Sequence, residues 1–144
     1  MKYSLIVVAV VLVVAFLLLG GKGSKDGASF QKISQEDAWK LMNSDDFAGV
    51  VLDVRTKSEY DAGHIPGAIC VPNETIADKE PAALKDKNQT ILVYCRSGAR
   101  SKAACKKLAN MGYTDIRDFG GIMTWKYEVG EKRYRGRDFW KTLS

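Results

Sequence analysis

The stretch ILVYCRSGARSKAACKKL, residues 91–108, joins an apolar run to a helical pattern through a short polar turn. The run at 91–94 is apolar and contains β-branched residues, which is typical of a strand buried on both faces. Cys95 ends this run, and after Arg100 the apolar residues recur at helical spacing. The stretch therefore predicts a strand, a tight loop and a helix, with a thiol where the strand enters the loop.

A loop between a strand and a helix start can bind an anion, because its N–H groups converge and the helix dipole adds positive potential. Gly98 permits a sharp turn, and a thiol at the start of such a loop is expected to exist largely as thiolate. The loop therefore suits a nucleophilic cysteine that carries a group through a covalent intermediate. The plainer alternative is a cysteine that only packs within a strand. The candidate anion-binding residues are Arg96, Ser97, Gly98, Ala99, Arg100 and Ser101.

Strand and helix patterns alternate along most of the chain, which predicts an α/β fold around a mostly parallel sheet. In such sheets ligands bind at the carboxyl ends of the strands, where the cysteine loop lies. Strands are expected within residues 30–33, 49–54, 67–71, 90–95 and 115–119. Helices are expected within residues 35–43, 56–63, 81–87, 100–112 and 121–128.

The two ends of the chain differ from this middle part. Residues 1–21 form an apolar run after Lys2, which predicts a signal peptide or an uncleaved membrane anchor and hence an exported, periplasmic or otherwise extracytoplasmic protein. Residues 22–29 form a polar, glycine-rich tether, residues 30–129 the folded domain, and residues 130–144 a basic, aromatic tail. The apolar segment would make the membrane a partner if it is not cleaved.

Composition excludes several classes of function. The net charge of +5 fits anionic small molecules or a membrane surface, and no nucleic-acid-binding motif accompanies it. A single histidine and three cysteines without a CxxC pair give no support for a zinc site. An odd number of cysteines in an exported protein indicates at least one free thiol.

Three motifs carry a resemblance: LDVRTKSEYDAGHIPGAI (52–69), YCRSGARS (94–101) and FGGIMTW (119–125). In this order they resemble a single-domain rhodanese, a thiosulfate sulfurtransferase-like module. The resemblance implies a three-layer α/β/α sandwich whose central sheet has about five strands. It also implies that Cys95 bears a persulfide within an active-site loop. The residues that match the segment supporting this loop are Asp53, Arg55 and Glu59, and Arg55 and Glu59 are expected to form an ion pair.

The length of the loop bears on the substrate. Phosphatases of the same fold resemble this chain but need a larger loop, whereas only four residues lie between Cys95 and Arg100. Tyr94 also stands where those phosphatases commonly have histidine. The smaller loop favours a single sulfur atom, moved from thiosulfate or a persulfide donor to a thiol or cyanide by catalytic Cys95. The expected reaction needs no metal and no cofactor.

Two other functions stay open from the sequence. One is an exported sulfur-carrier or sulfide-sensing persulfide module with little turnover of small molecules. The other is a non-catalytic interaction domain on a membrane tether, which the intact loop around Cys95 disfavours.

Several conspicuous residues are expected to be structural. His64 is assigned to a turn, and Trp39 and Trp125 are assigned to the core. Cys70 and Cys105 are assigned to packing, with a resolving thiol as the alternative. The tail aromatics Tyr134, Phe139 and Trp140 are expected to dock on the domain, with contact to a membrane surface as the alternative.

Overall fold

The structure is a computed structural model that describes residues 29–130. Five parallel strands form one sheet in the order β1-β5-β4-β2-β3, which confirms the predicted α/β class and its five-stranded sheet. The strands are β1 (Gln31–Lys32), β2 (Val50–Asp53), β3 (Ile69–Cys70), β4 (Thr90–Cys95) and β5 (Asp115–Gly121).

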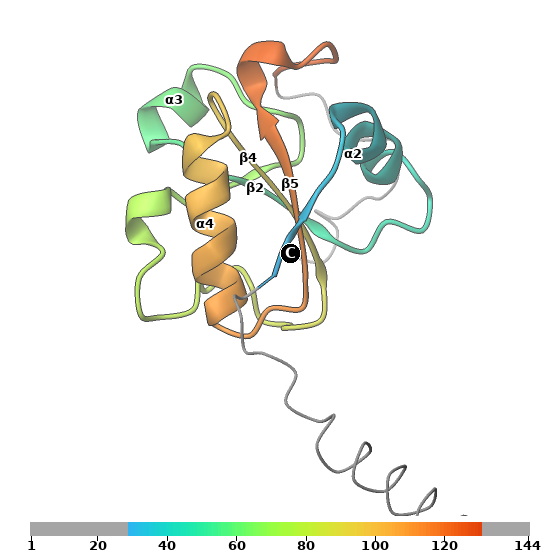
Figure 1. The fold of residues 1–144 in the computed structure, drawn as a ribbon. Coiled ribbons are helices and arrows are strands. Elements are labelled where there is room, and N and C mark those ends of the chain that lie inside the picture. Colours follow the sequence, from blue (N-terminus) through green and yellow to red (C-terminus); the bar gives the residue numbers. More distant parts are fainter. Residues whose placement is uncertain (1–28, 131–144) are drawn as a thin grey trace, which may run out of the picture.

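Helices cover both faces of this sheet, as the predicted three-layer sandwich requires. Figure 1 shows α4 and α2 on opposite sides of the strands. The helices are α2 (Gln35–Met42), α3 (Lys57–Asp61) and α4 (Ala99–Asn110), and the 3₁₀ turns are η1 (Asn73–Thr75) and η2 (Ile122–Thr124).

The side chains of β4 alternate between two hydrophobic cores. Ile91, Val93 and Cys95 pack with the buried face of α4, whereas Leu92 and Tyr94 pack with α2. Because β4 is the middle strand of the sheet, both of its faces are covered, which explains its continuous apolar sequence. The alternation places the Cys95 side chain on the α4 face.

Two predicted helices do not form. Residues 81–87 make turns, with Leu84 as the buried anchor, and the Leu84 N–H donates to the Pro81 carbonyl. One buried apolar side chain gives this segment no continuous face with which to stabilise a helix. Residues 121–128 contain only the single 3₁₀ turn η2, because Trp125 returns to an extended backbone with φ −68° and ψ 125°.

The tryptophans lie nearer the surface than predicted. Trp39 is 37% exposed on α2 and stacks on Tyr127, with ring centroids 4.8 Å apart, so its assignment to the core is wrong. Trp125 is half-buried and packs against Phe119 at the edge of the α2-side core. The extended backbone after η2 lets Trp125 and Tyr127 reach this cluster.

The signal or anchor segment (1–21), most of the tether (22–29) and nearly all of the tail (130–144) lie outside the described residues. These assignments, including those of Tyr134, Phe139 and Trp140, stay predictions. Within residues 29–130, no helix has the length and apolar character needed to cross a membrane.

Candidate active site

The carboxyl ends of three neighbouring strands bring the candidate residues to one edge of the sheet. Asp53 at the end of β2 is in register with Tyr94 of β4 and with Cys70 of β3. Cys95 is in register with Gly121 at the end of β5. The cysteine loop, the Asp53 segment and the Gly120–Gly121 pair therefore meet at the edge where ligands bind in parallel sheets.

The loop folds over the sulfur of Cys95. The backbone N–H of Gly98 donates a hydrogen bond to Cys95 Sγ at 3.0 Å. Gly98 has φ +107°, in the left-handed region, and serves as the N-cap of α4. The sulfur thus accepts a loop amide beside the positive end of a 12-residue helix, an arrangement that favours a negative charge on sulfur.

The loop rests directly on the backbone of β5. A Cβ atom at Gly121 would lie 2.1 Å from the Arg96 carbonyl oxygen, so a larger residue at 121 would displace the loop. The Met123 N–H also donates to the Arg96 carbonyl at 3.2 Å. The register of β5 against β4 shifts between Val93 and Cys95, and this irregularity brings Gly121 opposite the cysteine. The motif FGGIMTW thus forms the support of the loop.

The Ser101 side chain points into the protein, toward Asp118 of β5. This side chain is fully buried, and its hydroxyl donates to Asp118 Oδ1 at 2.8 Å and lies 3.0 Å from the Gly98 carbonyl oxygen. Asp118 also accepts the Gly120 N–H at 3.0 Å. The Ser101 hydroxyl therefore joins the loop to β5, and a role for Ser101 in anion binding stays a prediction. Sequence reasoning missed Asp118, which no motif marked.

The two loop arginines have different environments. Arg100 forms a two-point ion pair with Glu59, with nitrogen–oxygen distances of 2.7 and 2.9 Å. Arg96 is exposed and, among the described residues, has no carboxylate partner. Ser97 and Ala99 are also exposed. The positive charge of Arg96 is therefore open to solvent, while Arg100 ties the start of α4 to α3.

Glu59 connects this ion pair to the N-terminus of α3. It accepts the Thr56 N–H at 3.0 Å, and the Thr56 hydroxyl accepts the Glu59 N–H, which completes a capping box. The Arg100 guanidinium and the Thr56 N–H together hold the pKa of the Glu59 carboxyl well below its usual range.

The predicted ion pair between Arg55 and Glu59 is wrong. Arg55 instead binds Asp53, with Nε 2.9 Å from Oδ1 and Nη2 2.6 Å from Oδ2. Residues four apart face each other within one helix, whereas Arg55 lies in the bend between β2 and the Thr56 N-cap of α3, so it is not on the helix that carries Glu59. Asp53 and Arg55 form a buried ion pair, and their role in supporting the site stays a prediction.

Tyr94 completes the buried network around Asp53. Its hydroxyl donates to Asp53 Oδ2 at 2.7 Å and accepts the Ile65 N–H at 3.0 Å. The Tyr94 side chain is fully buried, next to Cys95 in β4. The sequence marks this position only because Tyr94 stands where phosphatases of the same fold commonly have histidine. Tyr94 therefore fixes the end of β4 against β2 and against the segment before β3.

His64 and the other cysteines have structural surroundings. His64 stacks on Tyr60 with centroids 3.7 Å apart, and its Nδ1 lies 2.9 Å from the Tyr60 carbonyl oxygen. Cys105 is fully buried on α4, and burial raises the pKa of its thiol, which keeps it protonated. Burial also raises the pKa of half-buried Cys70. All three cysteines are free thiols.

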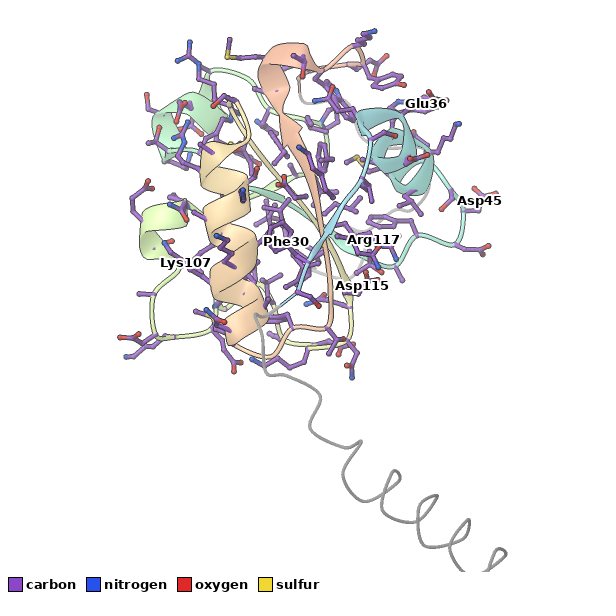
Figure 2. The ribbon with its side chains drawn as sticks, viewed as in Figure 1. Phe30, Glu36, Asp45, Lys107, Asp115 and Arg117 are labelled. Carbon is purple, nitrogen blue, oxygen red and sulfur yellow. The ribbon has the colours of Figure 1, made fainter. Side chains whose placement is uncertain are left out.

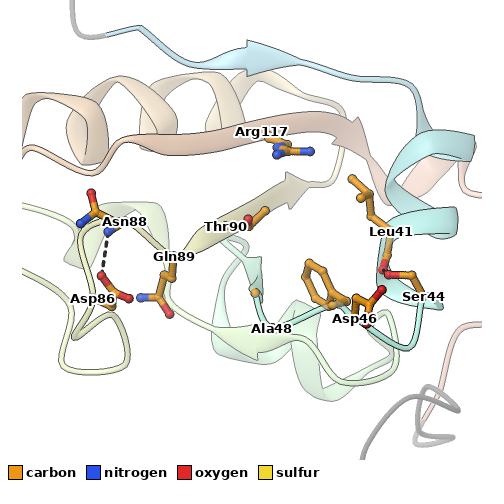
Figure 3. A pocket seen from close by; sticks show the side chains of 11 residues that line it. Leu41, Ser44, Asp46, Ala48, Asp86, Asn88, Gln89, Thr90 and Arg117 are labelled. Atoms are coloured by element: carbon orange, nitrogen blue, oxygen red, sulfur yellow. Dashed lines mark hydrogen bonds between the residues drawn. The ribbon is translucent and has the colours of Figure 1, made fainter.

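A cavity of about 420 Å³ lies at the opposite end of the strands (Figure 3). Its lining includes Gly49, just before β2, and Thr90 at the start of β4. Cys95 ends the same strand β4, so the cavity and the thiol lie at opposite edges of the sheet. Arg117 lines the cavity, but Asp115 already holds its guanidinium at 2.8 and 2.9 Å. The cavity is separate from the cysteine site.

Comparison with known proteins assigns this arrangement to a family. The rhodanese-like domain family matches residues 34–128, which include the cysteine loop and its supporting strands. The chain belongs to the rhodanese family. Among relatives, the thiosulfate sulfurtransferase PspE of Escherichia coli is 38% identical over 71 residues, covering 49% of this chain and 68% of that protein. The thiosulfate sulfurtransferase GlpE of Pseudoalteromonas translucida is 31% identical over 105 residues, covering 72% of this chain and 96% of that protein.

Solved rhodanese structures have the same fold. A rhodanese with anions from E. coli superposes with a TM-score of 0.54 at 33% identity, over 59% of this chain and all of that one. The human single-domain sulfurtransferase TSTD1 superposes with a TM-score of 0.58 at 25% identity, over 69% of this chain and all of that one. Some relatives are much longer: the rhodanese domain matches 25% of the adenylyltransferase and sulfurtransferase UBA4 of Meyerozyma guilliermondii. These relatives identify the chain as a member of a sulfurtransferase family.

Proposed function

We propose that this rhodanese moves a sulfane sulfur from thiosulfate or a persulfide donor to a thiol or cyanide through a persulfide on Cys95. The observation that carries the proposal is the Gly98 N–H, which donates to Cys95 Sγ at 3.0 Å beneath the start of α4. A loop that stabilises negative sulfur also stabilises a terminal persulfide anion in the same place. Arg96, exposed and without a carboxylate partner in the described part of the chain, supplies charge for an anionic donor.

The reaction proceeds in two displacements. The Cys95 thiolate attacks the outer sulfur of thiosulfate; a sulfur–sulfur bond forms on Cys95, and sulfite leaves with the electron pair of the broken bond. Cyanide or an acceptor thiolate then attacks the outer sulfur of the persulfide. The Cys95 thiolate leaves with the electron pair, and thiocyanate or the acceptor's persulfide is released. Neither step needs an external oxidant or reductant.

Steady-state kinetics test this proposal. Thiocyanate formation from thiosulfate and cyanide is measured with the full chain, with Cys95→Ser and with Cys105→Ala as the matched control. We expect loss of activity in Cys95→Ser and near-normal activity in Cys105→Ala, because Cys105 is fully buried in α4 and burial raises the pKa of its thiol, which keeps it protonated. Normal sulfur transfer by Cys95→Ser would refute the proposal. Persulfide formation with negligible thiocyanate release would favour the sulfur-carrier alternative.

We also propose that residues 1–21 direct the chain out of the cytoplasm, on the strength of their apolar sequence alone. Fractionation of cells that express the full chain tests this. Recovery in the periplasm or with the membrane is expected, and recovery in the cytoplasm contradicts it.

A further inference from the structure

The surface that leads away from the Cys95 loop along α4 is strongly basic. Residues 96–110 contain five basic side chains and no acidic one. Arg100 is paired with Glu59. Lys107, which Figure 2 labels on α4, donates to the Asn73 carbonyl at 2.9 Å. The remaining three, Arg96, Lys102 and Lys106, are exposed and have no ion-pair partner among residues 29–130; we call them the basic α4 face.

The basic α4 face is continuous with the active-site loop. Ala99, Lys102 and Lys106 are spaced by three and four residues, so they form one exposed stripe on the helix. The stripe begins at the loop and extends about 10 Å along the helix axis, at about 1.5 Å per residue. The opposite stripe, which includes Ala104 and Leu108, is buried against the sheet. A ligand that contacts the whole face therefore extends well beyond Cys95.

The size and charge of this face select its occupant. Thiosulfate and cyanide are too small to contact Lys106 while their sulfur or carbon is at Cys95. The tail of this chain, residues 131–144, carries five basic and two acidic side chains, so its charge opposes docking there. A folded acidic protein supplies both a negative surface and a thiol. Met123 offers such a protein an apolar contact beside the loop. Its side chain is 66% exposed, and its backbone N–H donates to the Arg96 carbonyl.

We propose that the basic α4 face docks an acidic protein whose reactive cysteine, bordered by Asp or Glu, accepts the sulfur from Cys95. The inference rests on the proposed sulfur transfer and names the class of its acceptor. Complementary charge at such a surface raises the rate of association with the partner and orients it, and high salt weakens both effects by screening the charges.

Transfer to matched peptides tests the proposal. The full chain is first loaded with sulfur from thiosulfate, and loss of its persulfide is followed with two peptides. In one peptide a cysteine is bordered by glutamates, and in the other by glutamines. At low salt we expect the acidic peptide to react about tenfold faster, with an advantage that falls as salt rises. The double change Lys102→Glu, Lys106→Glu should abolish the advantage and leave transfer to the neutral thiol 2-mercaptoethanol unchanged.

The control is Lys79→Glu, Lys85→Glu, which makes the same change of charge at two exposed lysines between η1 and β4. This variant should keep the preference for the acidic peptide. Equal rates for both peptides in a chain that loads sulfur normally would overturn the docking proposal alone. If the α4 changes instead only weaken sedimentation with phosphatidylglycerol vesicles or binding to an oligonucleotide, the face binds those polyanions and the proposal fails. Failure to load sulfur at all would overturn the proposed function and this inference with it.

Discussion

At the scale of single residues, the site depends on a few buried hydrogen bonds that hold an exposed loop. Cys95 is 1% exposed, yet the loop residues on either side of Gly98 are exposed. The sulfur is therefore buried beneath the loop, and a substrate must reach it by passing the exposed loop residues. Ser101 and Asp118 link this loop to β5 from beneath.

Replacing Ser101 by alanine should destabilise the protein. Among the described residues, the change leaves the Gly120 N–H to donate to the buried Asp118 carboxylate, and an underpaired buried acceptor costs about 1–3 kcal/mol. Urea unfolding measures the free energy of unfolding. Ser97→Ala, at an exposed position in the same loop, should change it by less than about 0.5 kcal/mol. Equal losses in the two variants would contradict the role given to Ser101.

At the scale of elements, the active site forms where β4 enters α4 and where β5 ends beneath the loop. Two braces fix this junction: the backbone contact of Gly121 with Arg96, and the ion pair between Arg100 on α4 and Glu59 on α3. Each brace joins segments far apart in the sequence, so each can be tested by a change outside the loop.

Gly121→Ala should impair sulfur transfer far more than Gly120→Ala. Gly121 has an ordinary extended backbone (φ −129°, ψ 147°), so its alanine adds no strain there, but the new Cβ would collide with the Arg96 carbonyl and move the loop. Displacement of a catalytic group by about 1 Å can cost roughly a hundredfold in rate. At Gly120, with φ +90°, alanine adds strain but meets no atom within 4 Å. Initial rates of transfer and the free energy of unfolding are measured for both. Similar rates of sulfur transfer in the two variants would contradict the proposed contact between Gly121 and the Arg96 carbonyl.

Glu59→Gln should destabilise the protein at neutral pH and much less in acid. The pKa of Glu59 is lower in the folded protein than in the unfolded chain, so the ionised carboxylate stabilises the fold. This stabilisation is complete above the ordinary pKa of about 4.3, and it is lost as the pH falls toward the pKa of Glu59 in the folded protein. Because the pair is partly exposed, we expect a loss of about 1 kcal/mol at pH 7. Urea unfolding at pH 7 and pH 3 measures the difference. A loss that is equal at both pH values would show that the carboxylate charge is not responsible.

The sequence predicted those elements whose signals are local. The apolar run of β4 and the helical spacing of α4 lie within single segments, and both elements form as expected. The partners of Arg55 and Ser101 were not predictable in this way. Ser101 meets Asp118 across 17 residues, and the direction of its hydroxyl depends on how α4 packs against β5. The predicted helix at 81–87 does not form because Leu84 is the one buried apolar side chain of the segment, which gives it no continuous apolar face.

At the scale of the whole molecule, one sheet separates two hydrophobic cores and carries the cysteine loop at its carboxyl edge. The α4-side core carries Cys95, whereas the α2-side core carries Tyr94, whose hydroxyl meets Asp53 at that edge. The fold thereby supports one thiol from both faces of the sheet. The same architecture leaves the basic α4 face open to solvent, which is where a larger acceptor can reach Cys95.

The measurement that tests the central claim most directly is the intact mass of the full chain before and after thiosulfate, and again after cyanide. We predict a gain of one sulfur atom after thiosulfate and its complete loss after cyanide, with no gain in Cys95→Ser. Peptide mapping should place the added sulfur on Cys95, because buried Cys105 is kept protonated. A wild-type chain that gains no sulfur, or a Cys95→Ser chain that gains as much, would contradict the account.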